Sequence, residues 1–572
     1  MGGILNGIGV SPGIARGAAF VLTCGERAVA ARRSIAAEDV AREHRRFEAA
    51  VSAATAQLAA LQQEVSRAGP TQVDVLGAQA LMLRDAGLRD RVLLLVEEER
   101  VNVEAALSDV IDGYTRTLGG VADAYLRERA ADVRDVGRRL LAALVDREGP
   151  RGLAIPEGAI VVSEELLPSA TARLQLGSVR AFVTERGGKF SHSSILARSM
   201  GTPAVAGVAD ASRAIRTGAR LVVDGAAGVV VVDPEPSVER EYERLEDALR
   251  AGKVALRERV DRPSVTADGV PVALLANVND PADVDAALRS GAEGIGLYRT
   301  DFQFSRRDAF PGEEEQRATL ARDAARFHPR RLVARLLDTG GDKLLPYFPL
   351  PPARNPALAL RGTRLLLRHL DVLKPQLRAF LRVAALHPVS ILLPMVGGVD
   401  EVRAARAVIR QVERDLSAEG VPFGGAVPVG AMIEVPSAAL AARALAREAD
   451  FLSLGTNDLV QYVVAADRED EGAARYYDPL HPGVLRLLQL VAEAAASAGR
   501  ELTLCGEMGG DPGNTALLLG LGVRAVSVAP GELLEVKDAI RRIDLRAAEA
   551  LARRAIDLGS GSDVAALLRA PG

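Results

Sequence analysis

Hydrophobic positions follow two different periods in the first part of the chain. From residue 36 to residue 147, apolar residues recur three and four positions apart between charged ones, in long stretches without proline, which is typical of amphipathic helices. Short β-rich runs flank this region, GIARGAAFVL before it and AIVVSEEL, RAFVTERGG and RLVVDGAAGVVVVDP after it. We therefore predict an α/β domain at residues 1–35 and 148–233, interrupted by a helical subdomain at 36–147.

A strongly charged helical pattern follows at residues 234–262 and ends at Pro263. A solvated helix on the surface of one domain would show this pattern, and so would a linker between two independently folded halves. We interpret the segment as a helical linker.

Beyond Pro263, short apolar runs alternate with amphipathic helical patterns. The eight runs that we interpret as strands lie at residues 272–277, 294–297, 332–337, 391–395, 429–434, 451–454, 502–505 and 525–528. Eight strand-then-helix units within one domain of this size are typical of a closed parallel barrel. We therefore predict a C-terminal (β/α)8 barrel at residues 263–572.

Composition and charge limit the possible functions. The chain has 572 residues, 48% hydrophobic and 26% charged, so it has enough apolar residues for several domain cores. A net charge of -4 without a lysine or arginine run argues against a nucleic-acid partner. The N-terminal sequence lacks the pattern of a signal peptide, no apolar run is long enough to span a bilayer, and the two cysteines fit a reducing compartment. We expect a cytoplasmic protein without membrane insertion.

Polar residues follow the predicted barrel strands at the ends where function collects in such barrels. Glu434 and Asp458 follow successive strands and could hold a hard divalent cation such as Mg²⁺, with water and substrate phosphate completing its shell. Each carboxylate could instead cap a helix or pair with an arginine. Arg299, Arg335 and Arg468 could donate to phosphate and carboxylate groups, although each of them alone could equally form a surface ion pair.

A histidine follows a glycine-rich turn in the sequence TERGGKFSHSSILARS. Gly187 and Gly188 permit a tight turn after a strand, and Ser191 can cap a helix that starts near His192. A histidine in that first turn faces the positive end of the helix dipole, which favours a neutral imidazole and an attached anion such as a phosphoryl group. A histidine among serines can also be purely structural.

Six motifs in order resemble the phosphoenolpyruvate-protein phosphotransferase (Enzyme I) family of the sugar phosphotransferase system. They are GGKFSHSSILARS, GLYRTDF, DTGGDK, IEVP, SLGTNDLVQY and LCGEMGGD. The resemblance starts at SPGIARG, includes RERAADVRDVGRRLL and continues to the last predicted strand. It therefore covers nearly the whole chain.

This resemblance implies roles for individual residues. His192 is implied to be the phosphorylated nucleophile, with Thr171 a candidate partner for its other ring nitrogen. Cys505 is implied to be the proton donor. The implied substrate-binding groups are Arg299, Arg335, Asn457, the backbone of Asp458, and Arg468, and the implied Mg²⁺ ligands are Glu434 and Asp458.

The resemblance also implies a reaction and partners. The phosphoryl group of phosphoenolpyruvate would pass to His192 and then to a histidine of the phosphocarrier protein HPr, the first step of sugar uptake by this system. The helical subdomain would dock HPr, and the barrel would form a homodimer. Gln79 stands where the family pattern has histidine, which leaves the preferred carrier open.

Two alternatives remain, a related enzyme and a protein of another functional class. A dikinase-type enzyme shares the phosphohistidine and barrel modules but also needs a nucleotide-binding domain, and the chain has no GxxxxGK[ST] loop. A catalytically inactive paralogue could dock HPr and act only as a regulator. The presence of His192, Glu434, Asp458 and Cys505 argues against this second alternative.

Overall fold

The computed structural model of the chain describes residues 3–22, 32–65, 79–80, 82–83, 85–119, 124–145, 155–164, 179–187, 194, 197–198, 201–305, 307–341, 343–345, 347–351, 353–468, 470 and 472–570. The chain divides into two compact units, Met1–Gly252 and Lys253–Gly572. This division falls inside the segment 234–262 that was interpreted as a linker. The domain boundaries given above stay predictions.

The first unit contains an eight-stranded sheet with the order β1-β8-β7-β3-β4-β5-β6-β2. Strands β3, β4, β5 and β6 pair in parallel, and the remaining neighbours pair antiparallel. The strands are β1 Gly3–Asn6, β2 Ile8–Ser11, β3 Ile14–Leu22, β4 Ala159–Ser163, β5 Val179–Thr184, β6 Ala204–Ala206, β7 Arg220–Asp224 and β8 Val229–Val232. The β-rich runs on both sides of the helical region therefore form one sheet.

Both faces of this sheet carry apolar side chains. Ile160 and Val162 of β4 belong to one buried cluster, while Val161 of β4 and Phe182 of β5 belong to another. Successive side chains of a strand point to opposite faces, so a strand that is covered on both sides must be apolar at every position. This requirement explains the uninterrupted run AIVV at the start of β4.

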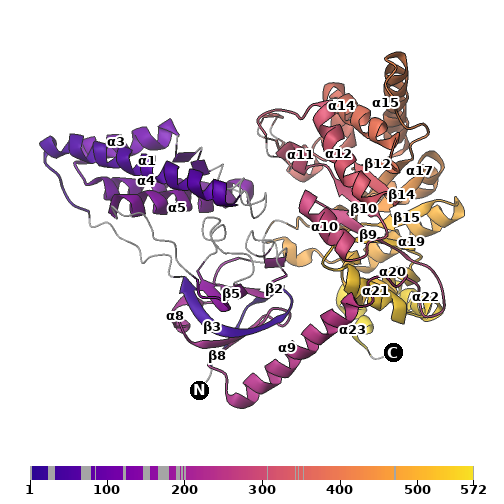
Figure 1. Cartoon of the computed structure of the whole chain (residues 1–572), viewed down its shortest axis with the longest axis horizontal. Coiled ribbons are helices and arrows are strands. Elements are labelled where there is room, and N and C mark those ends of the chain that lie inside the picture. The colour runs from indigo at the N-terminus through magenta and orange to yellow at the C-terminus, as the bar shows by residue number, and fades with distance from the viewer. Residues whose placement is uncertain are drawn as a thin grey trace. The chain divides into compact units, whose positions relative to one another are not determined.

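Four long helices of the first unit lie side by side (Figure 1). They are α1 Val40–Val65, α3 Ala86–Glu99, α4 Val103–Gly119 and α5 Ala124–Val145, and two shorter helices of this unit are η1 Ala37–Asp39 and α8 Ala211–Ala214. The apolar faces of the long helices enclose a core of their own, which includes Phe47, Val92 and Leu107. Gln79 is buried beside this core and donates a hydrogen bond of 2.8 Å from Nε2 to Oδ2 of Asp135.

Helix α9, Pro236–Arg257, contains the division between the two units. Near the middle of this helix, Arg16 of β3 donates from Nε to Glu246 at 2.9 Å. Just after its end, Lys537 donates from Nζ to the carbonyl of Val260 at 2.6 Å. The segment is thus held on each side of the division by a side chain of the unit to which that part belongs.

The second unit is a closed barrel of eight parallel strands. The strands are β9 Ala273–Val278, β10 Ile295–Arg299, β11 Leu332–Arg335, β12 Val389–Leu393, β13 Val429–Ile433, β14 Phe451–Leu454, β15 Glu501–Leu504 and β16 Ala525–Val528. The predicted fold class, mixed α/β with an eight-stranded parallel barrel, is confirmed. Strand β12 ends earlier than the predicted 391–395, because Pro394 has no N–H for the ladder and Met395 has a φ of 54°.

Helices surround the barrel, as Figure 1 shows for many of them. They are α10 Pro281–Arg289, α11 Phe302–Ser305, α12 Glu313–Phe327, α13 Thr363–Leu366, α14 Leu370–Ala384, α15 Val399–Ala418, α16 Pro436–Leu440, α17 Ala442–Glu448, α18 Thr456–Val464, α19 Pro482–Ser497, α20 Thr515–Gly520, α21 Leu533–Arg542, α22 Leu545–Ile556 and α23 Gly561–Arg569, with the short turns η2 Pro356–Leu358, η3 Ala474–Tyr476, η4 Glu507–Gly509 and η5 Pro512–Asn514. Among the described residues, no helix has the length and apolar character needed to cross a membrane.

Side chains of the barrel strands alternate between two buried layers. Ala334 of β11 and Ala431 of β13 belong to the large cluster that includes the surrounding helices. Val333 and Met432, one position away, belong to a small cluster with Leu392 of β12. Because this small cluster collects single residues from strands all around the barrel, it fills the barrel interior.

Candidate phosphoryl-transfer site

Strand alternation places charged side chains at one end of the barrel interior. Arg335 lies two residues after Val333, and Glu434 lies two residues after Met432, so each is on the same face as an interior residue. Arg299 ends β10 at the same level, because it pairs with Arg335 in the strand register. The carboxyl ends of the strands therefore carry several ionisable groups around one axis.

The carboxylate of Asp338, just after β11, is the centre of a buried ion-pair network. Arg361 donates to it from Nε and from Nη2, each at 2.9 Å, Lys343 donates from Nζ at 2.9 Å, and Arg335 donates from Nη1 at 3.2 Å. Burial opposes ionisation of Asp338, but the three cations outweigh it and hold its pKa well below the usual range. Arg335 also donates to Asp301 at 2.5 Å.

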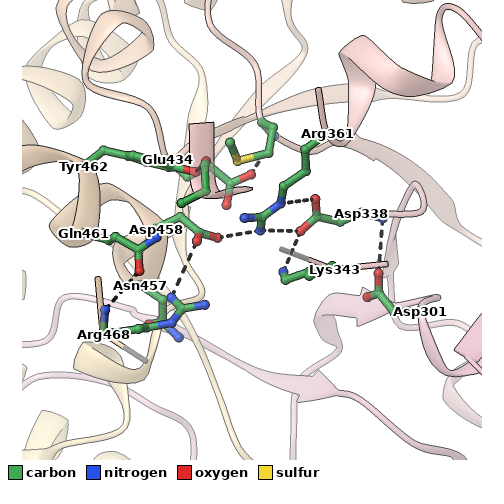
Figure 2. A network of polar contacts seen from close by, with 12 residues as sticks. Asp301, Asp338, Lys343, Arg361, Glu434, Asn457, Asp458, Gln461, Tyr462 and Arg468 are labelled. Carbon is green, nitrogen blue, oxygen red and sulfur yellow. Dashed lines mark hydrogen bonds and ion pairs between the residues drawn. The ribbon is translucent and has the colours of Figure 1, made fainter. Parts of the chain in front are cut away.

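Arg361 joins this network to the loop after β14. Its guanidinium is 1% exposed, and Nη2 also donates to Oδ2 of Asp458 at 3.2 Å (Figure 2). Arg468 approaches the other oxygen of Asp458, with Nη1 at 3.6 Å from Oδ1. Burial raises the pKa of Asp458, whereas the positive charges of Arg361 and Arg468 lower it. The effect of the charges outweighs that of burial, so the pKa lies below its ordinary value.

Glu434 follows β13 and is 2% exposed. Its Oε1 accepts a hydrogen bond from the backbone N–H of Met395 at 2.6 Å. Gly455 lets the carboxylate approach the end of β14, because a Cβ at this position would lie 2.7 Å from Oε2 of Glu434. Burial, followed by the negative charges of Asp458 and Asp338, raises the pKa of Glu434 to about 7.

Asn457 and Glu507 form a reciprocal pair between two neighbouring loops. The backbone N–H of Glu507 donates to Oδ1 of Asn457 at 2.9 Å, and Nδ2 of Asn457 donates to Oε1 of Glu507 at 3.3 Å. Tyr477 donates from its hydroxyl to the backbone carbonyl of Asn457 at 3.2 Å. The loop after β14 and the loop after β15 are therefore held together directly beside Asp458.

Arg299 and Arg335 place two guanidinium groups close together. Burial, and then the positive charge of Arg335, lower the pKa of Arg299. The Nε atom of Arg299 is buried and donates no hydrogen bond to any of the described residues. An anionic ligand at this position would offset the repulsion between the two guanidinium groups and accept a hydrogen bond from Nε of Arg299.

The thiol of Cys505 lies at the end of β15 and belongs to the interior cluster. Its Sγ lies 3.3 Å from Oγ of Ser453 and 3.3 Å from the carbonyl oxygen of Leu454. Burial is the main cause that raises the pKa of this thiol to about 11. The thiol is therefore protonated at neutral pH, as a proton donor must be.

The two carboxylates predicted as metal ligands fit a divalent cation electrostatically. The negative charge of Asp458 raises the pKa of Glu434, and Oδ1 of Asp458 is buried without a hydrogen bond. A cation beside both would remove the repulsion and complete the coordination of that oxygen. In the part of the chain that the structure describes, no three or more His, Cys, Asp or Glu residues gather as a metal-binding group, so solvent or substrate would supply the remaining ligands.

Comparison with known families divides the chain into three matched regions. Residues 6–129 match the N-terminal region of PEP-utilising enzymes, residues 155–228 match their mobile domain, and residues 253–545 match their PEP-binding domain. The chain is also similar to curated proteins over almost its whole length. The phosphoenolpyruvate-protein phosphotransferase of Bacillus sp. (strain S) is 37% identical over 566 residues, which cover 99% of this chain and 97% of that protein.

The chain belongs to the phosphoenolpyruvate-protein phosphotransferase family. Two further members show the same extent of similarity. The protein of Bacillus subtilis (strain 168) is 36% identical, covering 99% of both chains, and the protein of Haemophilus influenzae is 36% identical, covering 99% of this chain and 98% of its own. A solution structure of an Enzyme I protein matches 43% of this chain and 99% of its own, at 28% identity and a TM-score of 0.37.

Two residues implied by the family resemblance, His192 and Thr171, lie outside the described residues. The chain before His192 is described up to Gly187, which has a φ of 109° that suits glycine. After it, Ser194, Ala197 and Arg198 have helical backbone. The roles of His192 and Thr171 in this member of the family stay predictions.

The structure adds three residues to the set predicted for the barrel end of this phosphotransferase. Arg361 and Lys343 contact Asp338, which the sequence argument cited only as part of the DTGGDK motif. The sequence signal for Arg361 is weak, because arginine is the commonest cation of the chain and the stretch NPALALRGTR shows no strand end. Its contact with Asp458, which lies 97 positions away in the sequence, depends on closure of the barrel.

Proposed function

We propose that this protein transfers the phosphoryl group of phosphoenolpyruvate to its own His192 and then to a histidine of the phosphocarrier protein HPr. Membership of the phosphotransferase family supports the overall reaction. The observation that carries the proposal is the buried network at the barrel end, where Arg361 joins Asp338 after β11 to Asp458 after β14, with Glu434 nearby (Figure 2). Arg335 joins the same network through Asp338. The relatives favour neither the dikinase nor the inactive paralogue.

The arginines supply the binding charge for a substrate that carries a phosphate and a carboxylate. Arg299 and Arg335 repel each other, and the Nε of Arg299 has no hydrogen-bond acceptor, so both gain from a bound anion. Arg468 and the amide of Asn457 lie on the other side, next to Asp458. Acidic side chains contact Arg335, Arg468 and Asn457 before substrate arrives, so these three groups are preorganised.

Glu434 and Asp458 are the residues that would hold Mg²⁺. The ion would supply positive charge that neutralises the phosphate oxygens of the substrate during transfer. Binding it would also keep Glu434 ionised, because its charge opposes the repulsion by Asp458 and Asp338.

Cys505 would complete the reaction of the donor. The P–O bond of phosphoenolpyruvate breaks as the N–P bond to His192 forms, which leaves the enolate of pyruvate. The methylene carbon of this enolate then takes the proton of the Cys505 thiol, and the product is pyruvate. The nearby charges of Arg299 and Arg335 favour the resulting thiolate, which regains a proton from solvent.

The finer partner assignments are part of the same proposal. The four-helix region is proposed to dock HPr, and the barrel is proposed to mediate homodimer formation. A location in the cytoplasm also stays a prediction from the sequence. Each of these statements follows from the family resemblance.

Incubation with ³²P-labelled phosphoenolpyruvate and Mg²⁺ tests the proposal. We expect one labelled histidine, with a bond that is labile in acid and stable in alkali, and we expect no label in His192→Ala. As a control, His481→Asn should be labelled like the wild type, because His481 is exposed and only caps α19 through the N–H of Gly483. Full labelling of His192→Ala would overturn the assignment of the acceptor.

A further inference from the structure

Glu532 links the loops that follow the last two barrel strands. It precedes α21, and its Oε2 accepts a hydrogen bond of 3.2 Å from the backbone N–H of Ala529, just after β16. The same carboxylate lies flat against Gly510, so that a Cβ at position 510 would overlap it. Only glycine at 510 leaves room for this contact.

Gly510 belongs to the segment 505–511, which carries two residues of the candidate site. Cys505 begins the segment, and Glu507 forms the reciprocal pair with Asn457. Gly509 fits tightly against the barrel, because a Cβ there would lie 2.8 Å from Leu504 and 2.9 Å from Val526. Glu532 therefore contacts the far end of a segment whose near end lies inside the proposed donor site.

The electrostatic surroundings of Glu532 are acidic. Glu507 from η4, Asp511 from the loop before η5 and Glu535 from α21 all act on it with negative charge. Burial, the largest cause, together with these charges raises the pKa of Glu532 to about 7, against the opposing hydrogen bond from Ala529. Its uncharged form therefore predominates below neutrality, and its ionised form adds a negative charge beside Glu507 above neutrality.

We propose that Glu532 is a positioning residue of the donor site, which in its uncharged form holds the segment 505–511 against the barrel and on ionisation loosens it. The consequence for catalysis rests on the proposed function, because it assumes that this segment contacts phosphoenolpyruvate. Among the described residues, Glu532 makes no hydrogen bond or ion pair with those proposed to hold the substrate. It acts on them through Gly510 and through repulsion of Glu507.

Hydrogen exchange tests the structural part without any need for activity. The amides of residues 505–511 should exchange faster at pH 8.5 than at pH 6, after correction for intrinsic rates, by about threefold to tenfold in the full-length wild type. Glu532→Gln keeps the shape but carries no charge, so its corrected exchange should stay constant between these pH values. Glu535→Gln removes one of the charges that raise the pKa of Glu532 but keeps Glu532 itself, so its corrected exchange should still increase with pH, with the increase beginning at a lower pH than in the wild type.

Steady-state kinetics then tests the consequence for the reaction. At pH 6, Glu532→Gln and the wild type should have nearly the same kcat/KM for phosphoenolpyruvate. At pH 8.5, the kcat/KM of Glu532→Gln should be about threefold or more above that of the wild type. Labelling of His192 by phosphorylated HPr should not respond to the substitution. Glu532→Ala, which also loses the contact with Gly510, should show a lower kcat/KM at both pH values.

The two experiments separate the inference from the proposed function. The inference is wrong if the corrected amide exchange of residues 505–511 does not change with pH in the wild type. It is also wrong if this exchange changes with pH as much in Glu532→Gln as in the wild type. Both outcomes can be read even if the protein has no activity. A pH-dependent exchange together with a wild type that accepts no phosphoryl group would support the positioning contact and overturn the proposed function instead. A kinetic ratio that stays constant with pH would remove the link to catalysis.

Discussion

The barrel and the sheet of the first unit differ in the kind of polar side chain that they bury. On the described strands of the sheet, the buried polar side chains are hydroxyls, such as Ser163 and Thr184. At one end of the barrel, Arg361, Asp338 and Glu434 are each less than 3% exposed. Removing charges from water costs several kcal/mol per ion unless partners compensate it. A fold that needed only stability could use apolar residues there, so this concentration of charge indicates a ligand site.

The difference also separates two chemical tasks. Every candidate for donor binding, from Arg299 to Cys505, lies in the second unit, whereas the proposed acceptor His192 lies in the first. Each unit has apolar clusters made from its own residues. We therefore expect the two tasks to be separable, and the following predictions test how far.

Cutting the chain between the units should give the largest effect. The fragment 1–252 keeps Arg16 with Glu246, and the fragment 253–572 keeps Lys537 with Val260, so both should fold. The first should exchange phosphoryl groups with phosphorylated HPr but accept none from phosphoenolpyruvate, as measured by ³²P transfer. The second should bind phosphoenolpyruvate with Mg²⁺ in calorimetry. An unfolded first fragment would show that the units share a core.

Glu434→Gln and Asp458→Asn should lower transfer from phosphoenolpyruvate by about 10³-fold, because each removes a charge that the proposed metal site needs. Labelling of His192 by phosphorylated HPr should stay within about twofold of wild type, since that step does not use the barrel site. Glu448→Gln, which loses only an exposed pair with Arg403, serves as control. Normal turnover of both variants with Mg²⁺ chelated would refute the metal assignment.

Arg361→Met should destabilise the barrel by about 3–5 kcal/mol, because it leaves Asp338 and Asp458 buried with less compensating charge. Arg364→Met is a matched control three residues away. Arg364 is 49% exposed and pairs with Glu401, so its loss should cost about 1 kcal/mol or less. Urea unfolding of the fragment 253–572 measures both values. Equal losses would mean that the buried network contributes no more than a surface pair.

Cys505→Ala should lower kcat by about 10²-fold while phosphoenolpyruvate binds with an affinity within about twofold of wild type, because the thiol is assigned to proton transfer. The buried site changes little in volume, and among the described residues the contact with Ser453 is the only side-chain hydrogen bond that is lost. Pyruvate formation and calorimetric binding provide the two measurements. A parallel loss of affinity and turnover would make Cys505 a structural residue.

The smallest effect concerns the reactivity of the same thiol. A pKa of about 11 leaves less thiolate at pH 8 than an ordinary cysteine has, and the greater nucleophilicity of the more basic thiolate offsets part of this loss. Alkylation of Cys505 by iodoacetamide should therefore be about tenfold slower than that of a free thiol, or slower still because of burial. The rate should increase with pH up to about 11. Peptide mapping by mass spectrometry follows it, and unfolding in urea should abolish the difference.

Much of the barrel could be predicted from local pattern. The predicted runs at 429–434 and 525–528 correspond to β13 and β16 within one residue, because a strand buried on both faces must be a short continuous apolar run. The same regularity located Arg335 and Glu434 at strand ends. The helical region was also predictable, since its period of three and four residues extends over several long helices.

Contacts between distant residues could not be predicted in this way. Arg361 was indistinguishable in the sequence from many other arginines, and its role depends on Asp338 and Asp458, which reach it from two different strands. The raised pKa of Glu434 likewise requires the proximity of Asp458 and Asp338. Glu532 had no motif at all, and its contact with Gly510 exists only because β15 and β16 are neighbours in the barrel.

The sequence by itself thus determined the elements, their order and the chemical types available at each strand end, because these depend on residue periodicity and on motifs within a few positions. The tertiary structure alone decided which charges share a buried environment, which of them compensate each other, and which pKa values move. The physical reason is that electrostatic and packing energies depend on distances of a few ångströms, and closure of the barrel brings together residues that lie about a hundred positions apart in the chain.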